Sequence, residues 1–178
     1  MLRLILAFVD IMLHRRGPED LPSSNFFVWA LFAVSLSVVL GIHYATGGTL
    51  REVAASVIIA FLEVWFVWAL LRVFNREARF RQTMAAILGT NTILNVVSAP
   101  LLPMVEAAAV AAVAAPADAS VSLPVLLMWL IAIWSLLIGA FVFSRALERP
   151  YLLCLCIWIA YFFMMTILNF AIAPPQVA

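Results

Sequence analysis

One acidic and three polar residues stand inside otherwise apolar runs, at spacings that would let them share a site. Glu63 lies near the centre of its run, where a charged side chain such as Asp or Arg costs roughly 2.5 to 3.5 kcal/mol to insert in a membrane. In the next apolar run, Asn91, Asn95 and Ser98 follow one another after four and three residues. On a helix this spacing places them on one face. We therefore expect these four residues to meet as an intramembrane polar cluster.

Three uses of this polar cluster remain open from the sequence. A carboxyl group facing amides can hold a proton or a cation, as in a transport or ligand-binding site. A protonated Glu63 bonded to an asparagine would instead join two helices as a structural contact. The cluster could also lie against another membrane protein. Glu52 and Ser56 share the helix face of Glu63 and could mark an aqueous route to it, and Asn169 also needs a polar partner or cavity.

The sequence lacks the motifs of common membrane enzymes. It contains neither HExxH nor GxSxG, and it has no lysine for a Schiff base or a P-loop. Cys154 and Cys156 are two residues apart, so in a helix they point to different faces and predict neither a disulfide nor a metal pair. A formal net charge of +1 gives no indication of nucleic-acid binding. We expect a non-catalytic protein without cofactor, metal or nucleic-acid partner.

The elements that must position the polar cluster are membrane-spanning helices. Of the 178 residues, 67% are hydrophobic and 11% charged, whereas a soluble domain is about half apolar and about a quarter charged. A membrane span needs roughly 17 to 25 residues, and an open segment in lipid must be helical to satisfy its backbone. The composition therefore predicts an all-α, polytopic transmembrane bundle of five helices within residues 25–173. The predicted spans are 25–43, 53–74, 83–103, 124–144 and 151–173.

The arginines predict the orientation of these spans. Six of them form what we call the basic rim: Arg15, Arg16, Arg72, Arg76, Arg79 and Arg81. Arg145 and Arg149 fall on the same predicted side, and Arg51 falls on the other. Because positive loops stay inside, the N-terminus is predicted to be cytoplasmic and the tail, 174–178, periplasmic, in a cell inner membrane. The basic rim is interpreted as topology control with attraction to anionic lipid, or as a docking surface for an acidic partner.

Residues 1–24 are predicted to form a cytoplasmic-side amphipathic helix and a turn. Arg3, Asp10 and His14 recur at intervals of seven and four residues, which gives one narrow polar stripe on an otherwise apolar helix. The apolar part is too short to span a bilayer. We therefore expect an interfacial helix lying along the membrane surface.

Small residues and prolines predict where helices pack closely and where they break. Ala85–Ala86 and Gly139–Ala140 would allow close approach of neighbouring helices. Pro100 and Pro103 interrupt the third span, and an alanine-rich segment follows Glu106. Since alanine favours helix, this segment is interpreted either as a short outer helix that continues the third span or as a low-complexity spacer.

Two segments resemble parts of known membrane proteins. Residues 75–100, in which Phe-Arg-Gln at 80–82 leads into the third span, resemble the corresponding segment of bacterial YIP-family (Ypt-interacting protein) membrane proteins. Residues 15–22, RRGPEDLP, resemble the start of small proteobacterial membrane proteins. The resemblance implies a compact five-helix domain that acts through partners and membrane organisation. The DLxGP-like motif of eukaryotic members is not in this sequence, so their link to small GTPases is not carried over.

Two functional hypotheses follow. The first is a non-catalytic accessory subunit, scaffold or membrane-organising factor that acts on the lipid bilayer and on another membrane protein or a second copy of itself. The alternative is a small oligomeric transporter or channel subunit that uses Glu63. A water-accessible cavity reaching Glu63 would favour transport, whereas a dry contact to Asn91 or Asn95 would favour a structural role.

Overall fold

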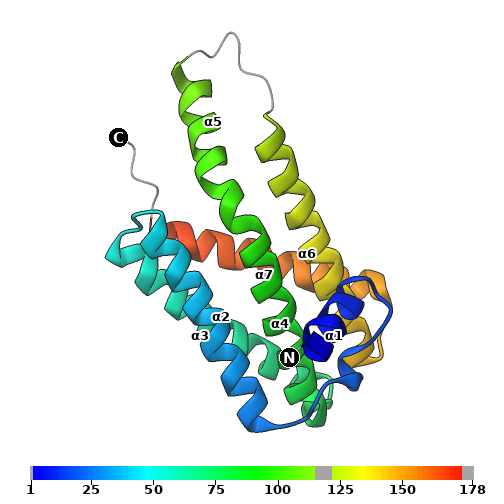
Figure 1. Cartoon of the computed structure of the whole chain (residues 1–178). Helices are drawn as coiled ribbons and strands as arrows, with labels where there is room; N and C mark the ends of the chain where they lie inside the picture. Colours follow the sequence, from blue (N-terminus) through cyan, green and yellow to red (C-terminus); the bar gives the residue numbers. More distant parts are fainter. Residues whose placement is uncertain (1, 115–121, 174–178) are drawn as a thin grey trace.

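The computed structural model describes residues 2–114 and 122–173, and these form α-helices joined by short turns, with no strand (Figure 1). The predicted all-α class is confirmed. The predicted tail, 174–178, lies outside the described residues. The helices are α1 (Leu2–Met12), α2 (Asn25–Ala45), α3 (Leu50–Val73), α4 (Phe80–Ser98), α5 (Leu102–Ala114), α6 (Leu123–Leu147) and α7 (Tyr151–Ile172). The single 3-10 turns are η1 (Pro18–Asp20), η2 (Glu77–Arg79) and η3 (Ala99–Leu101).

In the described part of the chain, five helices are long and apolar enough to cross a membrane, in agreement with the five predicted runs. The third of these differs in extent, because the helical segment continues from Glu77 to Ala112 through both prolines. Pro100 lies in the tighter turn η3, and Pro103 is the second residue of α5, where a missing backbone N–H costs little. The alanine-rich segment is therefore a helix that extends α4.

The turns that reverse the chain share one hydrogen-bond pattern. At the end of α3, the N–H of Arg76 donates to the carbonyl of Leu71 (2.7 Å) and that of Asn75 to the carbonyl of Arg72 (3.0 Å). This is a Schellman motif, which requires one residue in the left-handed conformation. Helices α1 and α2 end in the same way. The residues with positive φ are His14, Gly47, Asn75 and, after α6, Glu148.

Helix α4 is the centre of the bundle and contacts α1, α2, α3 and α6. All residues from Thr83 to Thr90 are buried, including Ala85 and Ala86. Helices α6 and α7 form a second tight pair, in which a Cβ at Gly139 would overlap the indole ring of Trp158. The small residues therefore lie where helices approach closely, as their sequence positions predict.

Helix α1 packs into the bundle with one face. Phe8, Ile11 and Met12 are buried against α4 and α6. The ring of Phe8 covers Gly89, where any Cβ would overlap it, and the indole N–H of Trp134 donates to the carbonyl of Met12 (3.2 Å). The exposed large hydrophobic residues of α1 and its end are Ile5, Leu6 and Leu13. The helix forms as expected, and its placement at the membrane interface stays a prediction.

The arrangement in Figure 1 gives the bundle two ends. At one end, which we call the arginine end because Arg76, Arg79 and Arg145 lie there, α2, α4 and α7 begin and α3 and α6 end. At the opposite end, α5 and the first half of α6 extend together beyond the α2–α3 hairpin.

Candidate functional site

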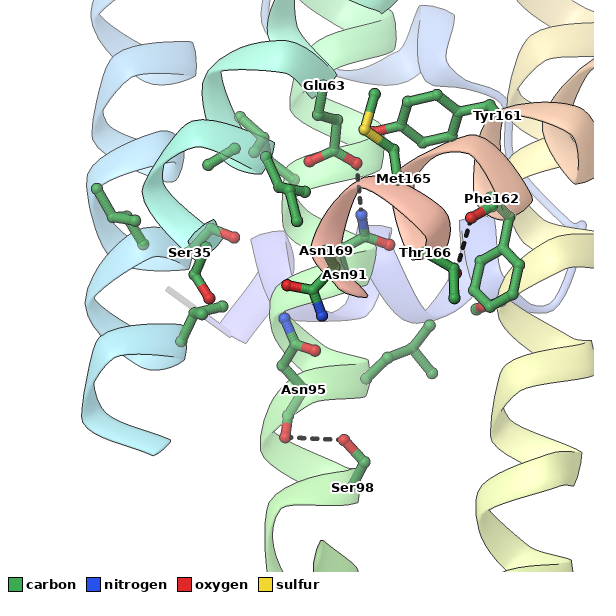
Figure 2. Close-up of a pocket in the computed structure, with 18 of the residues that line it drawn as sticks. Ser35, Glu63, Asn91, Asn95, Ser98, Tyr161, Phe162, Met165, Thr166 and Asn169 are labelled. Atoms are coloured by element: carbon green, nitrogen blue, oxygen red, sulfur yellow. Dashed lines mark hydrogen bonds between the residues drawn. The ribbon is translucent and has the colours of Figure 1, made fainter. Parts of the chain in front are cut away.

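A cavity of about 480 Å³ lies between α2, α3, α4, α6 and α7. All four residues of the predicted polar cluster line it, and Figure 2 shows their side chains turned toward the same space. Its polar lining consists of Ser35, Ser56, Glu63, Asn91, Asn95, Ser98, Ser135, Tyr161, Thr166 and Asn169. A compartment with a partly polar lining therefore lies inside a bundle of apolar helices.

Glu63 and Asn91 connect α3 and α4 across this cavity. The side-chain amide of Asn91 donates to Oε1 of Glu63 over 3.0 Å, and both side chains are partly buried (Figure 2). Among the described residues that line the cavity, Glu63 is the one charged side chain. The ion pairs that the structure describes all involve other carboxylates. The Glu63 carboxyl thus has one amide partner and no cationic partner within the described chain.

The polar side chains of the cavity fall into two groups. Thr166 bonds back to its own helix, through its hydroxyl to the carbonyl of Phe162 (2.8 Å), and Ser135 does the same on α6. By contrast, several polar side chains make no side-chain hydrogen bond to another described residue, namely Ser35, Asn95, Tyr161 and Asn169. Each polar group left without a hydrogen-bond partner in hydrocarbon raises the free energy by roughly several kcal/mol. This second group is therefore available to bond to a molecule inside the cavity.

The polar lining continues toward the end of the bundle where α2 joins α3. Ser56 lines the cavity, and its hydroxyl lies 2.7 Å from Nε2 of His43 on α2. Glu52 shares the helix face of Ser56 but is used differently, because its carboxylate accepts from the N–H of Thr49 (2.7 Å) and caps α3. Of the predicted aqueous route, Ser56 lines the cavity and Glu52 does not.

Sequence reasoning found part of this lining. Asn169 stood out because an amide in an apolar run needs a partner, and it lies at the cavity with its side chain exposed. Ser35, Tyr161 and His43 were missed. Serine and tyrosine are ordinary packing residues within spans, and His43 meets Ser56 only because of the geometry of the α2–α3 hairpin. No single-helix spacing contains that information.

The basic rim divides into separate contacts at the arginine end. Arg76 and Arg79 both form ion pairs with Glu148, just after α6. Arg79 also donates to the carbonyl of Arg145 (2.8 Å), one of the carbonyls left free at the end of α6. The remaining rim residues are placed as follows: Arg16 pairs with Asp10 (3.3 Å), Arg72 with Glu77 (3.4 Å), Arg81 donates to the carbonyl of Ser23 (3.3 Å), and Arg15 is exposed.

Glu19, in the turn before α2, joins three segments at this end. Its carboxylate accepts from Nε of Arg145 (3.1 Å), and its backbone carbonyl accepts from the side-chain amide of Gln82 (3.1 Å). Partial burial raises the pKa of Glu19, but a hydrogen bond from its own backbone, the hydrogen bond from Arg145 and the charges of Arg145 and Arg79 outweigh this effect. The pKa of Glu19 is therefore held below its usual range. The segment 15–22 thus contacts the segment 80–82 through Glu19 and Gln82.

No protein-family model, no curated protein and no solved structure matches this chain. The YIP-family resemblance is therefore a proposal that rests on the residues quoted for it. The function has to be inferred from the geometry of the cavity and of the bundle.

Proposed function

We propose that this chain is a small transporter or channel subunit that binds its substrate in the polar cavity, with Glu63 as the charged residue. The observation that carries the proposal is the cavity itself, which joins one carboxyl group to several unpaired hydrogen-bonding side chains inside membrane-spanning helices. The contact from Asn91 is compatible with this role, because it engages one oxygen of the carboxyl group.

The chemistry of Glu63 in this setting supports an exchange site. A charged carboxylate without a cationic partner is costly in a membrane interior, so it is stable only when it carries a proton or binds a cation. Asn91 holds the carboxyl group at a defined position by its 3.0 Å hydrogen bond in either state, since both keep an acceptor oxygen. Alternation between proton and cation is the basic requirement of a coupled transporter.

We also propose that the chain functions as part of an oligomer and that it has a fixed orientation in the membrane. Many transporters are built from paired repeats that surround a central site, whereas five spans form one unpaired set. We therefore propose that the chain functions with a second copy of itself or with another membrane protein. The arginine end is proposed to face the cytoplasm of a bacterial inner membrane, because positively charged loops are retained inside.

Reconstitution tests the proposal. Vesicles containing the wild-type chain should pass protons or small cations down an imposed gradient, and Glu63→Gln should abolish this flux. Glu106→Gln is the matched control, because it neutralises an exposed carboxylate on α5 that does not line the cavity. Wild-type vesicles no more permeable than empty ones, or equal flux from the Glu63→Gln vesicles, would contradict the proposal.

A second candidate function is favoured by the length of the third spanning segment. Its 36 residues would extend about 54 Å at roughly 1.5 Å per residue, compared with a hydrocarbon core of about 30 Å. Its far part, α5, leaves Met104 and Val110 more than half exposed. We propose that this surface would contact another membrane protein if the chain is an accessory or scaffold subunit.

Site-specific crosslinking tests this second candidate. A photoreactive residue at Val110 should give one discrete crosslinked product in native membranes, whereas the same residue at the exposed Leu152 on α7 serves as the lipid-facing control. Equal and diffuse labelling from both positions would argue against a partner on α5.

A further inference from the structure

We propose that the cavity binds a primary or secondary ammonium cation that carries an apolar body. The inference rests on the proposed transport function, because it names the substrate class of that site.

The charge of the lining selects for a cation. Glu63 is the one charged side chain among the described residues of the cavity, and the arginines lie elsewhere. An anion would meet a carboxylate with no positive charge to offset it. A cation would neutralise that carboxylate in a region where water screens weakly.

The volume selects for a molecule rather than a bare ion. The cavity holds about 480 Å³, which falls within the roughly 300 to 1,000 Å³ of small-molecule sites, whereas one water occupies about 30 Å³ in the liquid. The described residues contain no group of three His, Cys, Asp or Glu side chains that could hold a metal ion. The cavity therefore suits a ligand of several heavy atoms.

The walls of the cavity match an amphipathic ligand. Polar side chains of α4 follow one helix face from Asn91 through Asn95 to Ser98, next to Glu63 of α3 (Figure 2). Apolar side chains from all five helices line the space between the polar ones, among them Leu36, Ile59, Leu94, Ile131 and Met165. A charged head at Glu63 would thus leave room for an apolar body against these side chains.

The aromatic residues decide which kind of ammonium group fits. Both faces of the Tyr161 ring are covered, by Phe66 with centroids 4.3 Å apart and by Trp158 with centroids 4.8 Å apart. Trp158 in turn packs against Phe143. A quaternary ammonium ion binds best over an open aromatic face, and Tyr161 and Trp158, two of the four aromatic residues that line the cavity, do not offer one because their rings are stacked in this way. The cavity instead offers acceptors for N–H groups, including the carboxyl of Glu63 and the unpaired Tyr161 hydroxyl.

Equilibrium dialysis with labelled hexylammonium tests the inference on the purified chain in mild detergent. This probe is protonated at neutral pH, as a lysine side chain is. Saturable binding of one equivalent to the wild-type chain is expected. Glu63→Gln should weaken it by roughly tenfold or more, the size expected for loss of a charged hydrogen bond. Glu106→Gln should bind as the wild type does, which controls for partition into detergent.

Competing compounds separate the possible outcomes. Unlabelled tetraethylammonium and neutral hexanol should compete poorly, and equal competition by tetraethylammonium would overturn the requirement for N–H donors. Tyr161→Phe keeps the ring stack, so a weaker affinity in this variant would support the hydroxyl as an acceptor and an unchanged affinity would remove it from the site. Absence of saturable hexylammonium binding together with Glu63-dependent proton or metal-ion flux would overturn the inference and leave the proposed function standing. Absence of both would overturn both.

Discussion

Arg76 and Arg79 donate to different oxygens of the same Glu148 carboxylate. This one residue, just after α6, thereby holds the short connection between α3 and α4 against the end of α6. Arg79 adds hydrogen bonds to the carbonyls of Arg145 (2.8 Å) and Ala146 (3.3 Å), which lack partners within their own helix. Glu148 makes these contacts from a left-handed conformation with φ of 53°. The contacts compensate for a backbone conformation that costs about 1 to 2 kcal/mol in a residue other than glycine.

Substitution of Glu148 should separate the backbone cost from the ion pairs. Both Glu148→Ala and Glu148→Gly lose the contacts with Arg76 and Arg79, but glycine adopts the left-handed conformation without strain. We expect both variants to be less stable than the wild type in detergent unfolding, with the glycine variant more stable than the alanine variant by about 1 kcal/mol. Equal stability of the two variants would show that the conformation carries no cost.

The stability of the arginine end should depend on pH through Glu19. The pKa of Glu19 is lowered in the folded chain, so its contribution is fully present above the unfolded value of about 4.3 and is lost as the pH falls through the folded value. The thermal unfolding temperature should therefore fall below about pH 4. In the Glu19→Gln variant this temperature should fall less over the same pH range, and an identical dependence of the unfolding temperature on pH in the two proteins would contradict the assignment.

Stability should fall more when Asn91, the donor of the hydrogen bond to Glu63, is replaced than when the charge of Glu63 is removed. Glu63→Gln retains an acceptor for the Asn91 amide, so we expect a stability within about 0.5 kcal/mol of the wild type. Asn91→Leu leaves the carboxyl group without its partner and should cost about 1 to 3 kcal/mol. Unfolding by a denaturing detergent measures both, and an Asn91→Leu variant as stable as the wild type would exclude a structural contribution from this bond.

The contact between Phe8 and Gly89 should be visible in a double-mutant cycle. A Cβ at Gly89 would overlap the Phe8 ring, so Gly89→Ala should displace α1 and cost about 1 to 3 kcal/mol by overpacking. Phe8→Ala removes the ring, so Gly89→Ala in that background should cost much less. Hydrogen exchange of α1 amides provides a local readout, and additive effects of the two substitutions would show that the two residues do not interact.

The sequence predicted those features that depend on one helix at a time. The apolar runs were sufficient for five spanning helices, and the spacing of Asn91, Asn95 and Ser98 was sufficient to place them on one face. The partners across helices could not be predicted in this way. Glu148 lies 69 residues after Arg79, and its pairing depends on how α4 and α6 are rotated against each other.

The N-terminal helix is a second case in which the sequence predicts a helix but not the helices that it packs against. A narrow polar stripe indicates an amphipathic helix, but it does not indicate which partner covers the apolar face. In the structure, α4 and α6 cover Phe8, Ile11 and Met12. Gly89 was the available signal, because a glycine inside a helix costs roughly 1 kcal/mol and needs a packing reason.

The position of α1 also has a consequence for how the protein is made. Helix α1 leaves the ribosome before α4 and α6, and the indole of Trp134 that bonds to Met12 lies 122 residues later. At roughly 5 to 20 residues per second, that indole is synthesised about 6 to 24 seconds after Met12. For the first part of this interval the apolar face of α1 has neither α4 nor α6 to cover it, and for the remainder it has α4 without the Trp134 contact of α6, so the lipid surface is the available cover. Helix α1 is therefore synthesised before both of the helices that hold it, and it can take its place in the bundle only after the first half of α6 has been made.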